Sequence, residues 1–227
     1  MKRKLLSMFF VMLLIGTVFT MISLGKLESG AEIIFEEDFN DLDNWYLIVY
    51  DKAGGSANDP EPQLDYEMGL PAPSLDVNGD GSCGDGAYSK NTFDYANGLI
   101  IEFDMYVASG YDWNWGRGGL SDHMPNLDHK RTDGAYVDPT RCDPSFVVGI
   151  GLNDDGDYNR RPPSLGFGIK AEDGSWDGYI YDSDASEYEN EWHHYKIEIE
   201  KSGYVNFYID GDFAWRTNKR IDKTLTP

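Results

Sequence analysis

The stretch at residues 191–211, EWHHYKIEIEKSGYVNFYIDG, decides the fold of this chain. Apolar and polar residues alternate over residues 195–200 and again over 205–209, which is the period of a strand with one buried face. Ser202 and Gly203 stand between the two runs and favour a tight turn. The stretch therefore predicts a β-hairpin.

The same short alternating runs recur along the rest of the chain, between turns rich in Gly, Asp and Asn. Strands are expected at residues 33–39, 47–50, 99–107, 146–152, 165–170 and 176–181. Two stretches do not fit this pattern: residues 51–73 are rich in Gly, Pro, Asp and Asn, and residues 108–144 hold no convincing strand, so we expect a long loop over 108–144. Many short strands without a long helix predict an all-β protein, a two-sheet antiparallel β-sandwich or jelly roll.

Charge and composition exclude several classes of function. The 227 residues include 19 Lys and Arg against 40 Asp and Glu, a net charge of −21. Such an acidic surface repels phosphate backbones and anionic lipid, which argues against binding to nucleic acid or to a membrane surface. A hydrophobic share of 41%, with 14% aromatic residues, is sufficient for a real core and argues against global disorder.

Residues 1–30 have the composition of a targeting segment. Lys2, Arg3 and Lys4 precede an apolar run over residues 5–24. This pattern predicts either a cleaved secretion signal or a retained N-terminal anchor helix, since twenty helical residues span about 30 Å. Under both alternatives residues 31–227 form one domain that is secreted or displayed on the cell surface.

Cys83 and Cys142 both fall in the exported part. An even number of cysteines outside the cytoplasm predicts a disulfide, which would stabilise the fold by about 4 kcal/mol on the chain-entropy model. Two unpaired buried thiols are the alternative.

Residues 37–45, EDFNDLDNW, together with the hairpin at 191–211, resemble the concanavalin A-like lectin/glucanase superfamily, which includes laminin-G-like modules and family 16 glucanases. The resemblance implies two antiparallel sheets, one of them concave and commonly holding carbohydrate. It also implies a final strand that returns beside the first. After Arg216 no such strand is visible, so we expect either a fragment of a longer protein or a strand donated by another subunit.

The glucanase branch of that superfamily carries a catalytic strand of the form E-x-D-x-E or E-x-D-x-x-E. Glu102 and Asp104 match the first two acids, but Tyr106 or Val107 holds the third position. Retaining hydrolysis needs two carboxyl groups about 5–5.5 Å apart. The missing acid argues against catalysis and favours a strand whose polar face points outward.

Residues 76–81, DVNGDG, reproduce the first half of a calcium loop through Asp76, Asn78 and Asp80. The loop is not an EF-hand, because Ala87 holds the position where an EF-hand has its bidentate Glu. A Ca²⁺ site and a metal-free Asx/Gly turn remain two open alternatives.

The most suggestive stretch for a ligand is residues 111–119, YDWNWGRGG. Two Trp rings on one face of a loop would form a stacking platform for a sugar, flanked by side chains that bond to hydroxyl groups. The candidate carbohydrate-binding residues are Tyr111, Asp112, Trp113, Asn114, Trp115 and Arg117. The alternative is that both rings fold back over the sheet as part of a secondary core.

Together these patterns predict an extracellular, non-catalytic, lectin-like module that binds a polysaccharide or glycan, with Ca²⁺ as a possible support. Two other classes remain open: a polysaccharide-cleaving hydrolase or lyase of the same fold, and a structural or adhesion module of a cell-surface protein.

Overall fold

The computed structural model describes residues 33–50, 62–69, 72–77, 85–108, 115–138, 146–153, 164–182 and 184–224. The chain divides into two compact units, residues 1–38 and 39–227. Residues 33–38 of the first unit form neither helix nor strand, so the strand expected at 33–39 is wrong. In a strand, neighbouring residues point to opposite faces, yet Ile33 and Ile34 are both exposed. The predicted signal or anchor segment lies outside the described residues.

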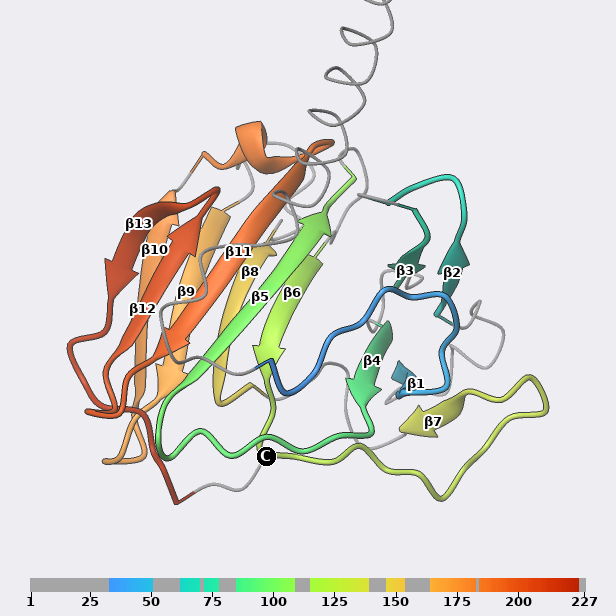
Figure 1. Cartoon of the computed structure of the whole chain (residues 1–227), viewed down its shortest axis with the longest axis horizontal. Coiled ribbons are helices and arrows are strands. Elements are labelled where there is room, and N and C mark those ends of the chain that lie inside the picture. Colours follow the sequence, from blue (N-terminus) through green and yellow to red (C-terminus); the bar gives the residue numbers. More distant parts are fainter. Residues whose placement is uncertain are drawn as a thin grey trace, which may run out of the picture. The chain divides into compact units, whose positions relative to one another are not determined.

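The second unit contains two four-stranded sheets that face each other (Figure 1). The polar sheet, in the order β13-β12-β11-β5, consists of β5 (Leu99–Tyr106), β11 (Trp192–Ile199), β12 (Val205–Ile209) and β13 (Asp212–Arg216). The glycine sheet, in the order β10-β9-β8-β6, consists of β6 (Trp115–Leu120), β8 (Val148–Asn153), β9 (Ser164–Lys170) and β10 (Trp176–Asp182). All neighbouring strands in both sheets are antiparallel, which confirms the predicted two-sheet antiparallel β-sandwich.

Shorter elements accompany the sandwich. A small sheet has the order β4-β1-β7, where β1 (Trp45–Tyr50) pairs antiparallel with β4 (Asp85–Ser89) and parallel with β7 (Tyr136–Asp138). A hairpin is formed by β2 (Gln63–Asp65) and β3 (Ser74–Asp76), and a single 3₁₀ turn, η1, covers Ser186–Tyr188. No helix in the described part of the chain is long and apolar enough to cross a membrane.

The hairpin predicted from residues 191–211 is confirmed as β11 and β12. Its register places Ile197 opposite Phe207 and Ile199 opposite Val205, so the apolar residues of both strands share the buried face. Gly203 in the turn has φ +93°, a conformation that glycine adopts without steric cost.

The main core lies between the two sheets. Phe207 of β12 is fully buried and stacks on Phe167 of β9, with 5.0 Å between ring centroids. Trp215 of β13 stacks on Phe207 from the side, at 5.6 Å. Apolar residues of all the other strands in the two sheets, except edge strand β10, belong to the same core, and those of β5 are partly buried. Burial of this apolar surface is the main force that holds the sheets together.

Strands β6 and β7 both lie within residues 108–144, where we expected only a loop, and that expectation is wrong. The sequence of β6, WGRGGL, has low β-propensity because glycine adds no side-chain packing. The strand forms because it pairs with β8 along its length and because its glycines allow the opposite sheet to approach. A Cβ on Gly116 would lie 2.3 Å from Val107 Cγ2, and one on Gly118 would lie 2.4 Å from Phe103 Cζ.

Candidate functional site

Glycines occupy the outward-facing positions along the centre of the glycine sheet. In β8 and β9, buried apolar residues alternate with glycines, as in VGIGL and LGFGI. Since successive strand residues point to opposite faces, these glycines point away from the core. We call the outward-facing glycines of the central strands and of β10 the glycine strip: Gly149, Gly151, Gly166, Gly168 and Gly178.

Strand register aligns the glycine strip into rows across the sheet. In one row Gly178 pairs with Gly168, Gly168 with Gly149, and Gly149 with Gly119 of β6. The next row runs from Ile180 through Gly166 and Gly151 to Arg117. Side chains of neighbouring residues lie over most of these glycines, and a ligand can approach the sheet backbone closely only where no side chain covers it.

Trp176 lies on one side of the glycine strip. A Cβ on Gly168 would lie 2.0 Å from its ring atom Cζ2, and one on Gly178 would lie 2.6 Å from Nε1, so the indole rests against the backbone of both strands. The residue is nevertheless 59% exposed. An indole supported by a sheet and open to solvent offers a rigid apolar surface on which a second ring can stack.

Arg117 lies at the other side of the strip, on β6. A Cβ on Gly151 would lie 3.0 Å from Arg117 Cγ and 3.7 Å from Cδ, so its aliphatic stem crosses Gly151. Its guanidinium carries five N–H donors, which suit hydroxyl and carboxylate oxygens. Of the candidate sugar-binding residues predicted from the sequence, the structure places the side chain of Arg117 on this face.

Gly166, between these two side chains, is the open position of the strip. The nearest atom to a Cβ built there is the backbone oxygen of Tyr179, at 3.4 Å, which is an ordinary contact. Neighbouring side chains account for the small size of Gly151 and Gly168, whereas packing does not account for Gly166.

The comparisons with known proteins concern the fold. No family model and no curated protein sequence matches the chain. A solved structure of the Emp47p carbohydrate recognition domain is similar at 12% sequence identity and a TM-score of 0.43, over 78% of this chain and 73% of that chain.

Several predicted site residues lie outside the described residues. Tyr111, Asp112, Trp113 and Asn114 are among them, as are Asn78, Asp80, Cys83 and Cys142, so the aromatic loop, the calcium site and the disulfide stay predictions. The structure describes the backbone of Trp115, at the start of β6, but not its side chain. Asp76 is the last residue of β3 and is partly buried. Within the described ranges no three His, Cys, Asp or Glu side chains are grouped to hold a metal ion.

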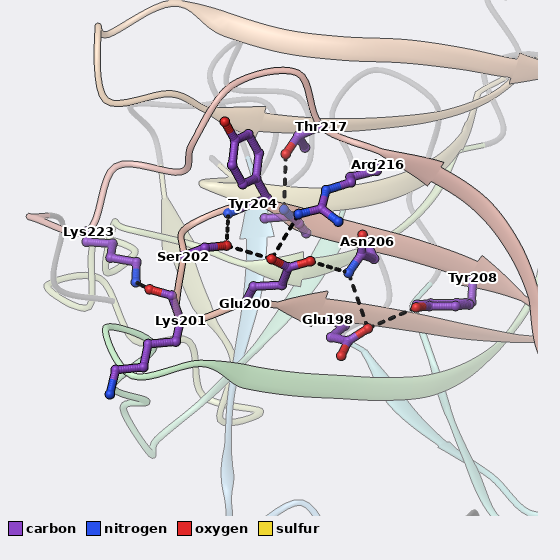
Figure 2. A network of polar contacts seen from close by, with 11 residues as sticks. Glu198, Glu200, Lys201, Ser202, Tyr204, Asn206, Tyr208, Arg216, Thr217 and Lys223 are labelled. Carbon is purple, nitrogen blue, oxygen red and sulfur yellow. Dashed lines mark hydrogen bonds and ion pairs between the residues drawn. The ribbon is translucent and has the colours of Figure 1, made fainter. Parts of the chain in front are cut away.

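The outer face of the polar sheet is covered by side chains that bond to one another (Figure 2). Glu198 accepts hydrogen bonds from Tyr208 Oη at 2.9 Å and from Asn206 Nδ2 at 3.3 Å. Glu200 accepts from Asn206 at 3.0 Å and from Arg216 Nη2 at 3.0 Å. These cross-strand contacts satisfy the polar groups of β11, β12 and β13 and stabilise the sheet.

Glu102 and Asp104, the acids considered for catalysis, lie on the same outer face, on β5. His194 of β11 stands opposite Asp104 and its Nδ1 lies 2.8 Å from Asp104 Oδ1, while its Nε2 lies 3.7 Å from Glu102 Oε1. At the third position Tyr106 packs its ring against Trp192 at 5.7 Å, and Val107 is buried.

The contact between His194 and Asp104 predicts that the stability of the fold depends on pH. The hydrogen bond to Asp104, with the charges of Asp104 and Glu102, raises the pKa of His194 above its ordinary 6.5. The stabilisation from this contact is fully present below the pKa that His194 has in the unfolded chain. It is lost as pH rises through the higher pKa of His194 in the folded protein. We therefore expect the free energy of unfolding to fall as pH rises above about 6.5, and to fall less in Asp104→Asn.

Urea unfolding at a series of pH values around and above 6.5 measures how steeply the free energy of unfolding falls with pH, which we call the slope. His123→Gln, which removes an exposed histidine elsewhere, serves as the control and should keep the slope of the unmodified protein. An Asp104→Asn slope equal to that of the unmodified protein would contradict the assignment.

Proposed function

We propose that this protein is a non-catalytic carbohydrate-binding module and that the outer face of the glycine sheet is its binding surface. The single observation that carries the proposal is that the exposed Trp176 rests on the glycine strip while no side chain lies within 4 Å of a Cβ built on Gly166. The flat indole stacks on the C–H face of a sugar ring, and Arg117 donates hydrogen bonds to its oxygens. A surface with an aromatic platform and few polar groups is typical of small-molecule recognition.

Gly166→Val is the most direct test of this surface. Its Cβ meets only the Tyr179 oxygen within 4 Å, which is an ordinary contact, and its two methyl groups extend into the space above the strip. Val also pairs across strands with Ile180, which favours the fold. We expect Gly166→Val to lose binding while its melting temperature stays the same or rises.

Native affinity electrophoresis in gels that contain neutral polysaccharides measures binding. The unmodified chain should be retarded in one of the gels, Gly166→Val should not, and Trp176→Ala should bind about tenfold more weakly. Phe213→Ala is the matched control, because it removes an exposed ring from the polar sheet and should leave retardation unchanged. Repeating the gels with a calcium chelator tests whether the site predicted at residues 76–81 supports binding.

The rival functions give different results in the same experiment. New reducing or unsaturated ends in the polysaccharide would show a cleaving enzyme and contradict a non-catalytic module. Unchanged mobility in every gel would also contradict the proposal and would favour a structural or adhesion module, whose bare sheet face packs against another protein.

A further inference from the structure

A pocket of about 430 Å³ lies beside the small sheet, away from the glycine strip. Its volume falls within the range of small-molecule sites, about 300–1,000 Å³. Its lining includes four aromatic residues from three parts of the chain: Trp45 and Tyr46 of β1, Tyr66 after β2, and Tyr136 of β7. Tyr46 and Tyr136 meet edge to face at 5.9 Å, which fixes two of these rings relative to each other.

Two lysines line the same pocket. Lys90 Nζ lies 5.4 Å from the ring centroid of Tyr46, and Lys130 Nζ lies 5.3 Å from that of Tyr136. Each ammonium is thus positioned by a ring of the pocket wall. Lys90 also donates a hydrogen bond to the backbone oxygen of Asp43 at 2.6 Å, which uses one of its three N–H donors.

Basic residues outnumber acidic ones among the described residues that line the pocket, although the protein as a whole carries a net charge of −21. Among the described residues that line it, Asp133 is the only acidic one, and it forms an ion pair with Arg131 at 2.5 Å. The positive charges of Lys90 and Lys130 are therefore not cancelled from within the lining. Charge complementarity points to an anionic ligand, and the aromatic walls point to a ring with apolar faces.

We infer that this pocket is a second binding site, for a sugar that carries an anionic group. The sugar ring packs among Trp45, Tyr46 and Tyr136, and its carboxylate or sulfate ester lies between the ammonium groups of Lys90 and Lys130. This pocket shares no lining residue with the glycine strip, so it can bind an anionic sugar whether or not the strip binds carbohydrate.

Isothermal titration calorimetry of the full chain tests the inference with three probes: digalacturonic acid, galactose 6-sulfate and galactose. We expect at least one of the two anionic sugars to bind, more weakly as salt is added, and galactose to bind at least about tenfold more weakly. Comparison of the two anionic probes identifies whether the anionic group is a carboxylate or a sulfate ester. Equal binding of galactose, or no binding of either anion, would overturn the inference.

Charge variants assign the binding to the pocket. Lys90→Met and Lys130→Met keep most of the side-chain volume and should each weaken anion binding about tenfold, whereas Lys90→Arg should retain it. Both lysines are exposed, so the fold tolerates these changes. Lys201→Met, which removes an exposed lysine from the β11–β12 turn, is the matched control and should bind like the unmodified chain. Unchanged binding in both pocket Met variants would overturn the inference.

The Gly166→Val variant separates the two sites. Digalacturonic acid should bind this variant with unchanged affinity, and the Lys→Met variants should keep their retardation in gels of neutral polysaccharide. Loss of anion binding in Gly166→Val would place the anion on the glycine strip and refute the pocket.

Discussion

Phe207→Ala is expected to lower the free energy of unfolding by about 3–5 kcal/mol. Phe207 is fully buried, stacks on Phe167 of the opposite sheet at 5.0 Å and contacts Trp215 at 5.6 Å. Its removal leaves a cavity between two rings that belong to different sheets, and neither sheet can close it without a shift of its backbone. Guanidinium unfolding followed by tryptophan fluorescence measures the loss.

Phe213→Ala is the matched control, because Phe213 lies two residues from Trp215 on β13 but is 60% exposed. Its loss should change the free energy of unfolding by less than about 1 kcal/mol. If Phe207→Ala were equally mild, Phe207 would not join the two sheets and the described core would be wrong.

Gly119→Ala is expected to destabilise the protein by about 2–4 kcal/mol, although it adds only one methyl group to the glycine sheet. Gly119 has φ +156°, and a Cβ there would lie 2.1 Å from the backbone oxygen of Val148 and 2.8 Å from Gly149 Cα. The backbone of β8 cannot yield to this contact without breaking its pairing with β6. Thermal unfolding followed by circular dichroism measures the effect.

The same substitution at Gly166 is the control. Gly166 belongs to the same face, yet a Cβ there meets only an ordinary contact at 3.4 Å. Gly166→Ala should therefore match or exceed the stability of the unmodified chain. Equal melting temperatures for Gly119→Ala and Gly166→Ala would mean that the described register between β6 and β8 is incorrect.

The polar sheet could be predicted from the sequence because its signals are local. In β11 and β12, β-branched and aromatic residues alternate with polar ones, and the turn at Ser202 and Gly203 joins strands that are also neighbours in space. Alternation of this kind identifies the strands, the turn and the buried face at once. The outward direction of Glu102 and Asp104 follows from the same period.

The candidate site was less predictable, because the strand that carries Arg117 is built from glycines. Strand propensity cannot identify WGRGGL, which forms through pairing with β8 and through close approach of Phe103. The exposed position of Trp176 against Gly168 and Gly178 was also missed. A signal for it exists in the sequence: glycines replace polar residues as the alternating partners of buried residues in β8 and β9, which indicates an outer face on which other side chains can lie against the backbone.

The pocket beside the small sheet could not be predicted at all. Lys90, Lys130 and Tyr136 lie far from Trp45 in sequence. The antiparallel pairing of β1 with β4 brings Lys90 to the pocket, and the parallel pairing of β1 with β7 brings Tyr136, which bridges to Lys130. No local pattern specifies a pairing between strands separated by more than eighty residues.

The open space above Gly166 also bears on what this sequence was selected for. In a strand interior, glycine costs about 0.5–1 kcal/mol relative to alanine, because the unfolded chain loses more conformational freedom on folding. At Gly166 no neighbouring side chain requires that cost, so selection for thermal robustness alone would replace it with a branched residue. Under the proposed function, its presence marks a trade-off between stability and ligand binding, located at one residue where engineering for heat resistance would act against that binding.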